Sequence, residues 1–133
     1  MTQNIDLEIK VIKQFVDKLK QDRYVQFVSS RKNRHKFIVD LSHFNSLQWD
    51  KFDKVNGNET EIIMTTLQKS KVLDLNCYVI SENKEIDTKV LETKSAISQI
   101  VGYGIGTILV FGNADIIYYE GDKMNARYIS KAK

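Results

Sequence analysis

The sequence of 133 residues contains one cysteine and no proline. A single thiol, Cys77, excludes an intramolecular disulfide, so the chain is not a small disulfide-stapled domain. The first residues also lack the basic and then apolar pattern of a secretory signal. Together these absences predict a cytoplasmic protein that folds in a reducing compartment.

Long apolar runs are absent too. The four residues Ile108–Phe111 are as long as any uninterrupted apolar run, whereas a helix that crosses a bilayer needs about 20. Hydrophobic residues nevertheless make up 42% of the chain and charged residues 28%, which is too apolar for intrinsic disorder. No repeat, low-complexity tract or linker divides the sequence. We therefore expect one soluble globular domain over residues 1–133, with no membrane partner.

The first 41 residues are predicted to form a helix followed by a hairpin. Apolar residues from Ile5 to Leu19 recur every three or four positions, which indicates an amphipathic helix over about residues 4–21. Segments 24–28 and 35–41 are rich in β-branched and aromatic residues, and a polar stretch separates them. This pattern predicts two antiparallel strands joined by a basic tip.

The middle of the chain is predicted to alternate between helix and strand. Asn58 and Glu61 have the spacing of a capping box ahead of an apolar run, which predicts the start of a helix. In chain order the expected elements are a short helix within residues 42–55, a helix over 59–70, a strand over 75–81, a loop over 82–87, and a helix that opens at Thr88 or Thr93 and ends at Gly102.

Three short strands are predicted at the carboxyl end of the chain, over residues 107–111, 116–120 and 126–130. The turns between them are too short for crossover connections, so the strands should form an antiparallel meander. Ile108–Phe111 is apolar at every position, which is typical of an interior strand covered on both sides. The whole order of elements predicts an α+β domain, in which a largely antiparallel sheet of about six strands packs with about three helices.

The strongest charge cluster is the segment Arg31, Lys32, Asn33, Arg34, His35 and Lys36. Residues 1–40 contain nine Lys and Arg against five Asp and Glu, whereas residues 41–133 contain 11 against 12, so the positive excess is confined to the first part. A basic tip of this kind can follow the phosphates of a nucleic acid, while Tyr24 or Phe37 stacks on an unpaired base. The alternatives are an acidic protein partner, or a solvated turn whose like charges prevent strand pairing.

Three glycines surround Tyr103 in the segment Gly102–Gly106, which suggests comparison with phosphate-binding glycine loops. Those loops run from a strand into a helix, so that the helix amino terminus faces the anion. Here the order is reversed, and the segment is better explained as a helix stop followed by a tight connection. Tyr103, between two flexible residues, remains a candidate for contact with a ligand or partner.

Acidic residues gather between residues 82 and 94, where Glu92, Thr93 and Lys94 are similar to the short Glu-x-Lys motif of metal-dependent nucleases. In that motif carboxylates hold Mg²⁺ and the lysine orients a water molecule. The nuclease motif lies on a strand, however, and this one falls where a helix is predicted to begin. Acidic residues at a helix start are also explained by the helix dipole.

No residue pattern indicates nucleophilic catalysis or a metal centre. Cys77 alternates with apolar neighbours as a buried residue does, and His35 and His43 have no acidic partner nearby in sequence. Two histidines and one cysteine do not suffice for a structural zinc site. We therefore expect a non-enzymatic binding domain without a cofactor. It would contact a macromolecule, with nucleic acid as one candidate, through Arg31, Lys32, Arg34, His35, Lys36 and Tyr103, and a Mg²⁺-dependent nuclease or other small hydrolase is the alternative.

Overall fold

The computed structural model describes residues 3–123 and 126–132. Its helices are α1 (Ile5–Phe15), α2 (Lys18–Val28), α3 (His35–Ile38), α4 (Glu59–Lys69) and α5 (Thr93–Ile100), with short 3₁₀ turns at Leu41–His43 and Trp49–Lys51. Its strands are β1 (Phe52–Lys54), β2 (Asn76–Ser81), β3 (Val90–Glu92), β4 (Thr107–Phe111), β5 (Ile116–Glu120) and β6 (Arg127–Ser130).

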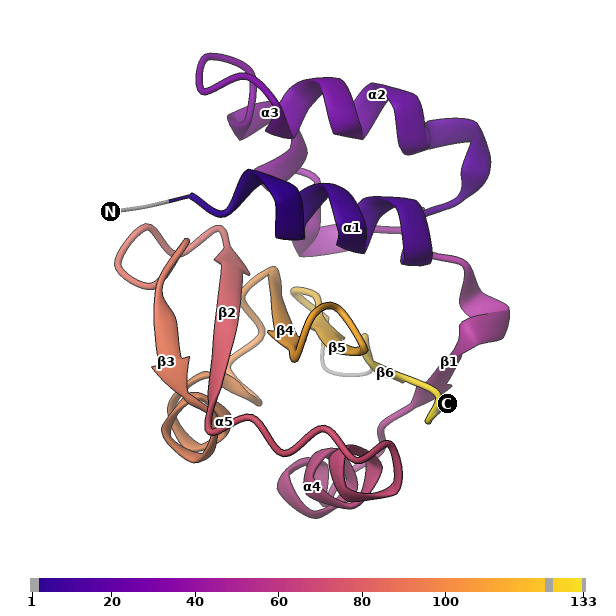
Figure 1. Ribbon diagram of the computed structural model, residues 1–133, viewed down its shortest axis with the longest axis vertical. Helices are drawn as coiled ribbons and strands as arrows, with labels where there is room; N and C mark the ends of the chain where they lie inside the picture. Colours follow the sequence, from indigo (N-terminus) through magenta and orange to yellow (C-terminus); the bar gives the residue numbers. More distant parts are fainter. Residues whose placement is uncertain (1–2, 124–125, 133) are drawn as a thin grey trace.

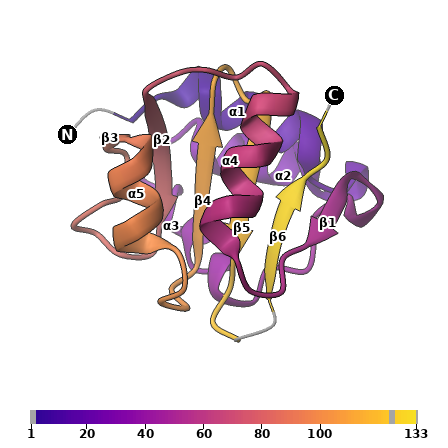
Figure 2. The same ribbon diagram turned by 90° about the horizontal axis from the view of Figure 1, so that it is seen from below.

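One antiparallel sheet forms the middle layer, with strand order β1-β6-β5-β4-β2-β3. Helix α1 covers one face, and α2 and α3 lie beyond it as an outer tier, whereas α4 and α5 cover the opposite face (Figures 1 and 2). This arrangement confirms the α+β class and the six-stranded antiparallel sheet, although the described chain contains five α-helices rather than about three. None of its helices is long and apolar enough to cross a membrane.

Strand β4 explains why the domain has two apolar cores. Ile108 and Val110 point into the core under α1, while Leu109 and Phe111 point into the core under α4 and α5. Every residue of this strand is buried, as its uninterrupted apolar sequence predicted. The predicted meander, the helix at residues 59–70 and the strand at 75–81 are likewise confirmed, within one residue at each boundary.

The predicted single helix over residues 4–21 is wrong, because the chain breaks at Val16 and Asp17. Val16 is extended and pairs with Leu47 in an isolated bridge. The Asp17 carboxylate then accepts the Leu19 N–H and caps α2. The helical periodicity continues through this break, which is why the sequence pattern alone did not place it.

The predicted basic hairpin is also wrong. Segment 24–28 belongs to α2, segment 35–38 forms the single turn α3, and the cations between them occupy a helix-to-helix turn. Tyr24 and Val28 are buried from one face of α2, at the i, i+4 spacing of a helix. Their aromatic and β-branched side chains had favoured a strand, but packing against the core overrides that preference.

Two short strands replace the hairpin in the sheet. Residues 52–54, which gave no strand signal, form edge strand β1 beside β6. Residues 90–92 form the other edge, β3, so of the two predicted helix starts Thr93 is the correct one. Gly102, with φ of +96°, follows α5 in the left-handed conformation that glycine permits.

Candidate nucleic-acid interface

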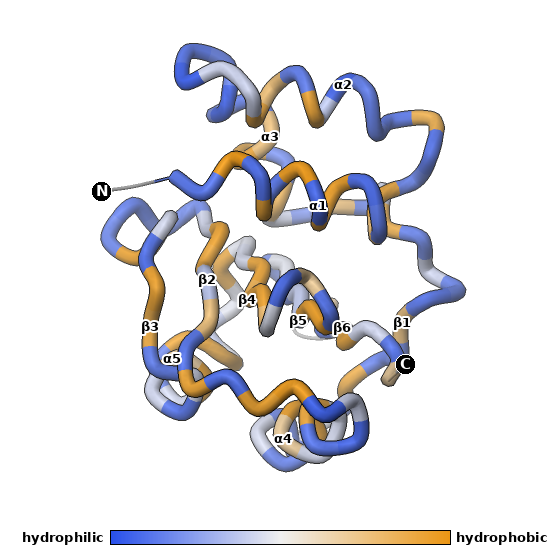
Figure 3. Tube along the Cα trace, in the orientation of Figure 1, coloured by the Kyte–Doolittle hydropathy of each residue, from blue (hydrophilic) through white to orange (hydrophobic). Residues whose placement is uncertain are grey.

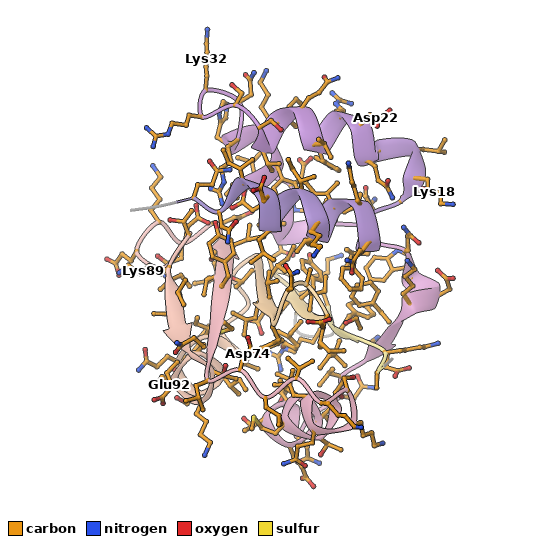
Figure 4. All side chains as sticks on the ribbon, viewed as in Figure 1. Lys18, Asp22, Lys32, Asp74, Lys89 and Glu92 are labelled. Atoms are coloured by element: carbon orange, nitrogen blue, oxygen red, sulfur yellow. The ribbon has the colours of Figure 1, made fainter. Side chains whose placement is uncertain are left out.

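The outer tier of helices presents the main positive surface of the domain. Residues 18–39 contain seven Lys and Arg and a single acid, Asp22. Six of these cations are exposed, and we call the surface that they form the α2–α3 face: Lys18, Lys20, Arg23, Arg31, Lys32 and Lys36. Figure 4 shows Lys18, Asp22 and Lys32 extending outward from this tier, and Figure 3 shows that the turn between α2 and α3 is hydrophilic.

None of the six cations forms a salt bridge within the described residues. Two of them are instead held by the ring of Phe27, with the Arg23 guanidinium carbon 5.7 Å and the Lys36 ammonium nitrogen 5.6 Å from its centroid. Such cation–π contacts position a charge without neutralising it. The face therefore carries positive charge that is available to an external anion.

A hollow of about 380 Å³ opens between α2 and α3 within this face. Its lining residues are Lys20, Arg23, Tyr24, Phe27, His35, Lys36, Val39 and Asp40. His35 is oriented by the contact of its Nδ1 with the Lys32 carbonyl oxygen, at 3.1 Å. Of the predicted site residues, His35 and Lys36 line this hollow, while Arg31 and Lys32 lie on the turn before α3. Lys20 falls in the helix predicted over residues 4–21 and Arg23 just before the strand predicted over 24–28, and neither segment was assigned to the site.

Arg34 is not part of the α2–α3 face, although it sits in the same sequence cluster. Its guanidinium turns inward and donates to both carboxylate oxygens of Glu8, at 3.0 and 2.8 Å, and to both of Asp87. Burial lowers the pKa of Arg34, but hydrogen bonds and charge from Asp87 and Glu8 outweigh burial and raise it above its ordinary value. Arg34 therefore joins α1 to the β2–β3 loop and has no free donor face for a phosphate.

Glu8 is the centre of this buried network. It has no exposed surface, and besides Arg34 it accepts the Tyr78 hydroxyl at 2.6 Å and the Gln3 amide at 2.8 Å. Burial, followed by the hydrogen bond and charge of Glu8, raises the pKa of Tyr78 above its ordinary value. A buried carboxylate with this set of donors is a structural group rather than a free acid or base.

Tyr103 is exposed over 68% of its surface on the loop between α5 and β4. The loop is fixed from below by Glu120, whose buried carboxylate accepts the N–H groups of Gly102 and Gly104, each at 2.8 Å, and the Tyr118 hydroxyl at 2.9 Å. Because Glu120 occupies these two N–H groups, the glycines do not cradle a phosphate. Tyr103 is exposed on this connection, and its contact with a ligand or partner stays a prediction.

Tyr103 and the α2–α3 face are separate features of the surface. The Tyr103 loop leaves α5, which covers the face of the sheet opposite α1 and α2 (Figure 2). Within the described residues, no side-chain hydrogen bond, ion pair or ring contact joins Tyr103 to any residue of the face. The two halves of the predicted site are therefore not brought together by such contacts.

The acidic residues of segment 82–94 are divided between the two ends of the β2–β3 hairpin. Glu82 accepts the Ser42 N–H at 2.9 Å, and Asp87 binds Arg34, whereas Glu92 lies at the far end and accepts the Ser95 hydroxyl. No group of three or more His, Cys, Asp or Glu side chains capable of holding a metal occurs within the described part of the chain. The sequence similarity to the nuclease motif thus has no matching cluster of ligands.

Cys77 and the histidines show no arrangement for nucleophilic catalysis. Burial raises the pKa of the Cys77 thiol to about 11, although a hydrogen bond with Thr93 lowers it slightly, and only 2% of the residue is exposed. His43 is exposed and lies 3.9 Å from Asp122, with no hydroxyl or thiol aligned on its ring in the described residues. Compared with family models, curated proteins and solved structures, the chain matches none of them.

Proposed function

We propose that this protein is a non-enzymatic, cytoplasmic binding domain that contacts nucleic acid through the α2–α3 face. The observation that carries the proposal is the set of six exposed cations, unpaired within the described residues, on one outer tier of helices. Phosphate contacts from Lys and Arg supply most of the affinity of non-specific nucleic-acid binding.

The distribution of charge makes this face distinct from an ordinary lysine-rich surface. Residues 17–40, which include the caps of the outer tier, carry a formal charge of +4, from seven cations and three acids, while the rest of the chain carries −1, from 13 cations and 14 acids. The positive charge of Arg34 is cancelled internally by Glu8 and Asp87. The remaining six cations thus form a local patch on an otherwise nearly neutral molecule, which favours oriented approach to a polyanion.

Binding of this kind must depend strongly on salt. If four of the six cations meet phosphates of a single strand, the logarithm of the affinity should fall with the logarithm of salt concentration with a slope of about −2.8. Affinity should then fall by about 50-fold between 50 and 200 mM salt.

The test is fluorescence anisotropy with a labelled 12-nucleotide strand and the double variant Arg23→Glu, Lys36→Glu. We expect this variant to lose at least tenfold in affinity at 50 mM salt. The matched control is Lys10→Glu, Lys13→Glu, which changes charge equally at two exposed cations of α1 outside the face and should have a much smaller effect.

Three outcomes overturn the proposal: no binding of the strand at either salt, equal losses in the two double variants, or binding of vesicles containing anionic lipid in place of the strand. The last outcome would assign the same cations, with exposed Leu19 and Val39 beside them, to a membrane surface.

A further inference from the structure

The hollow between α2 and α3 is lined by an acid as well as by cations of the α2–α3 face. Asp40 lines it together with Lys20, Arg23 and Lys36, yet in the described residues it forms no salt bridge with any of them. From this arrangement, and resting on the proposed function, we infer that the hollow takes one nucleotide unit of a single strand. The cations bind its phosphate, and Asp40 accepts a hydroxyl or amino group of its sugar or base.

The cations of the hollow come from two helices, and two of the three contact an aromatic ring in the absence of a ligand. Lys20 and Arg23 are one turn apart on α2, and Lys36 approaches from α3. Because Arg23 and Lys36 both lie against the Phe27 ring, their positions are restrained. A site that is already ordered loses less side-chain entropy when it binds an anion.

Asp40 supplies the hydrogen-bond acceptor for the sugar or base of the nucleotide. One of its oxygens, Oδ2, accepts the Tyr24 hydroxyl at 2.8 Å, while the described residues offer no hydrogen-bond donor to Oδ1. Burial, followed by the hydrogen bond and charge of Asp40, raises the pKa of Tyr24 to about 12, so the hydroxyl keeps its proton and holds the carboxylate in place. Oδ1 remains an acceptor beside the cations.

The three cations together with Asp40 should favour a nucleotide over inorganic phosphate. Inorganic phosphate would gain the three cations but would be repelled by Asp40, whereas a nucleotide unit also offers an amino group on most bases and, in RNA, the 2′-hydroxyl. In a duplex the base edges are already paired and the bases stacked, so a single nucleotide cannot enter a concave site without being unpaired. The volume of about 380 Å³ lies at the small end of the range for ligand sites.

The experiment is displacement of the labelled 12-nucleotide strand by adenosine monophosphate and by inorganic phosphate at 50 mM salt. We expect the nucleotide to displace the strand at a concentration at least tenfold below that of phosphate, and the single strand to bind at least tenfold tighter than a duplex of the same length. In Asp40→Asn, which keeps the size of the side chain and an acceptor for Tyr24, the preference for nucleotide over phosphate should shrink to about threefold or less.

Equal displacement by nucleotide and phosphate in the unmodified protein would overturn the inference, and this measurement does not depend on how the variant folds. An unchanged preference in folded Asp40→Asn would overturn the role of the carboxylate. In either case strand binding that is lost in Arg23→Glu, Lys36→Glu would leave the proposed function intact. If the strand does not bind at all, both the proposed function and the inference are wrong.

Discussion

Replacement of Arg34 by methionine should remove a large part of the unfolding free energy of this domain without changing any residue of the α2–α3 face. Methionine fills similar space but removes all four hydrogen bonds that Arg34 donates to Glu8 and Asp87. Among the described residues, Glu8, which has no exposed surface, would then keep only the Tyr78 hydroxyl and the Gln3 amide as partners of its carboxylate. A buried carboxylate stripped of its cation is among the most destabilising single changes.

The size of the effect follows from that burial. Removing one partner of a buried ion pair costs about 3–5 kcal/mol, because the other charge stays buried without compensation, and the total unfolding free energy of a domain is only roughly 5–15 kcal/mol. With an unfolding entropy of about 2.1 cal/mol/K per residue, the melting temperature should fall by about 10–18 °C. Arg34→Lys should lower the melting temperature by less than Arg34→Met does, because an ammonium group keeps the charge but cannot span two carboxylates as a guanidinium does.

Thermal and urea unfolding followed by circular dichroism would measure these changes. The matched control is Arg23→Met, an exposed cation with no ion pair in the described residues, for which we expect a change within about 0.5 kcal/mol. The double variant Arg34→Met, Glu8→Gln should recover part of the loss, because it removes the buried charge along with its partner. A loss below about 1 kcal/mol for Arg34→Met, the size expected of a surface ion pair, would refute the reasoning.

Three further predictions concern other parts of the fold. The Cys77 thiol, whose pKa burial raises to about 11, should react with a disulfide reagent at pH 8 only when urea unfolds the protein, and rapid reaction of the native form would contradict its burial. Gly106→Ala should lower the unfolding free energy by at least about 2 kcal/mol, since a Cβ would lie 2.5 Å from the Ser42 backbone nitrogen. A urea midpoint equal to that of the unmodified protein would show that the Gly106 and Ser42 backbones are not in tight contact. Burial raises the pKa of Tyr24 and of Tyr119 to about 12, so the folded state keeps protons that the unfolded state loses above pH 10. The urea midpoint should therefore be lower at pH 11 than at pH 9, and an unchanged midpoint would contradict these raised pKa values.

The elements that could be predicted from the sequence are those in which local pattern and final environment agree. Residues 108–111 are apolar at every position and form most of an interior strand. The helix at residues 59–70 follows a turn at Asn56–Asn58 and buries Ile63 and Leu67 from one face. In these segments the periodicity records burial that the tertiary structure then supplies.

The elements that could not be predicted depend on partners far away in sequence. Strand β1 has only three residues, and it exists because β6, some 75 positions later, pairs with it. The break at Val16 depends on its bridge to Leu47, although Asp17 did carry the signal of a helix cap. Long-range pairing of this kind leaves little trace in a local window.

The candidate site shows the same division. Composition placed the positive charge correctly in the first part of the chain, but it did not distinguish exposed Arg31 from buried Arg34, three positions later. That difference depends on Glu8 and Asp87, which meet only in the folded protein. Glu120 at the end of an apolar strand, on the same face as Tyr118, was a detectable sign of a buried acid.

The measurement that tests the central claim most directly is the salt dependence of strand binding, compared between the unmodified protein and Arg23→Glu, Lys36→Glu. If the α2–α3 face binds phosphates, a plot of log affinity against log salt should be linear with a slope near −3, and the double variant should have a slope shallower by about 1.4, the share of two single-strand phosphate contacts. A slope near zero in the unmodified protein, or the same slope in both, would contradict the account.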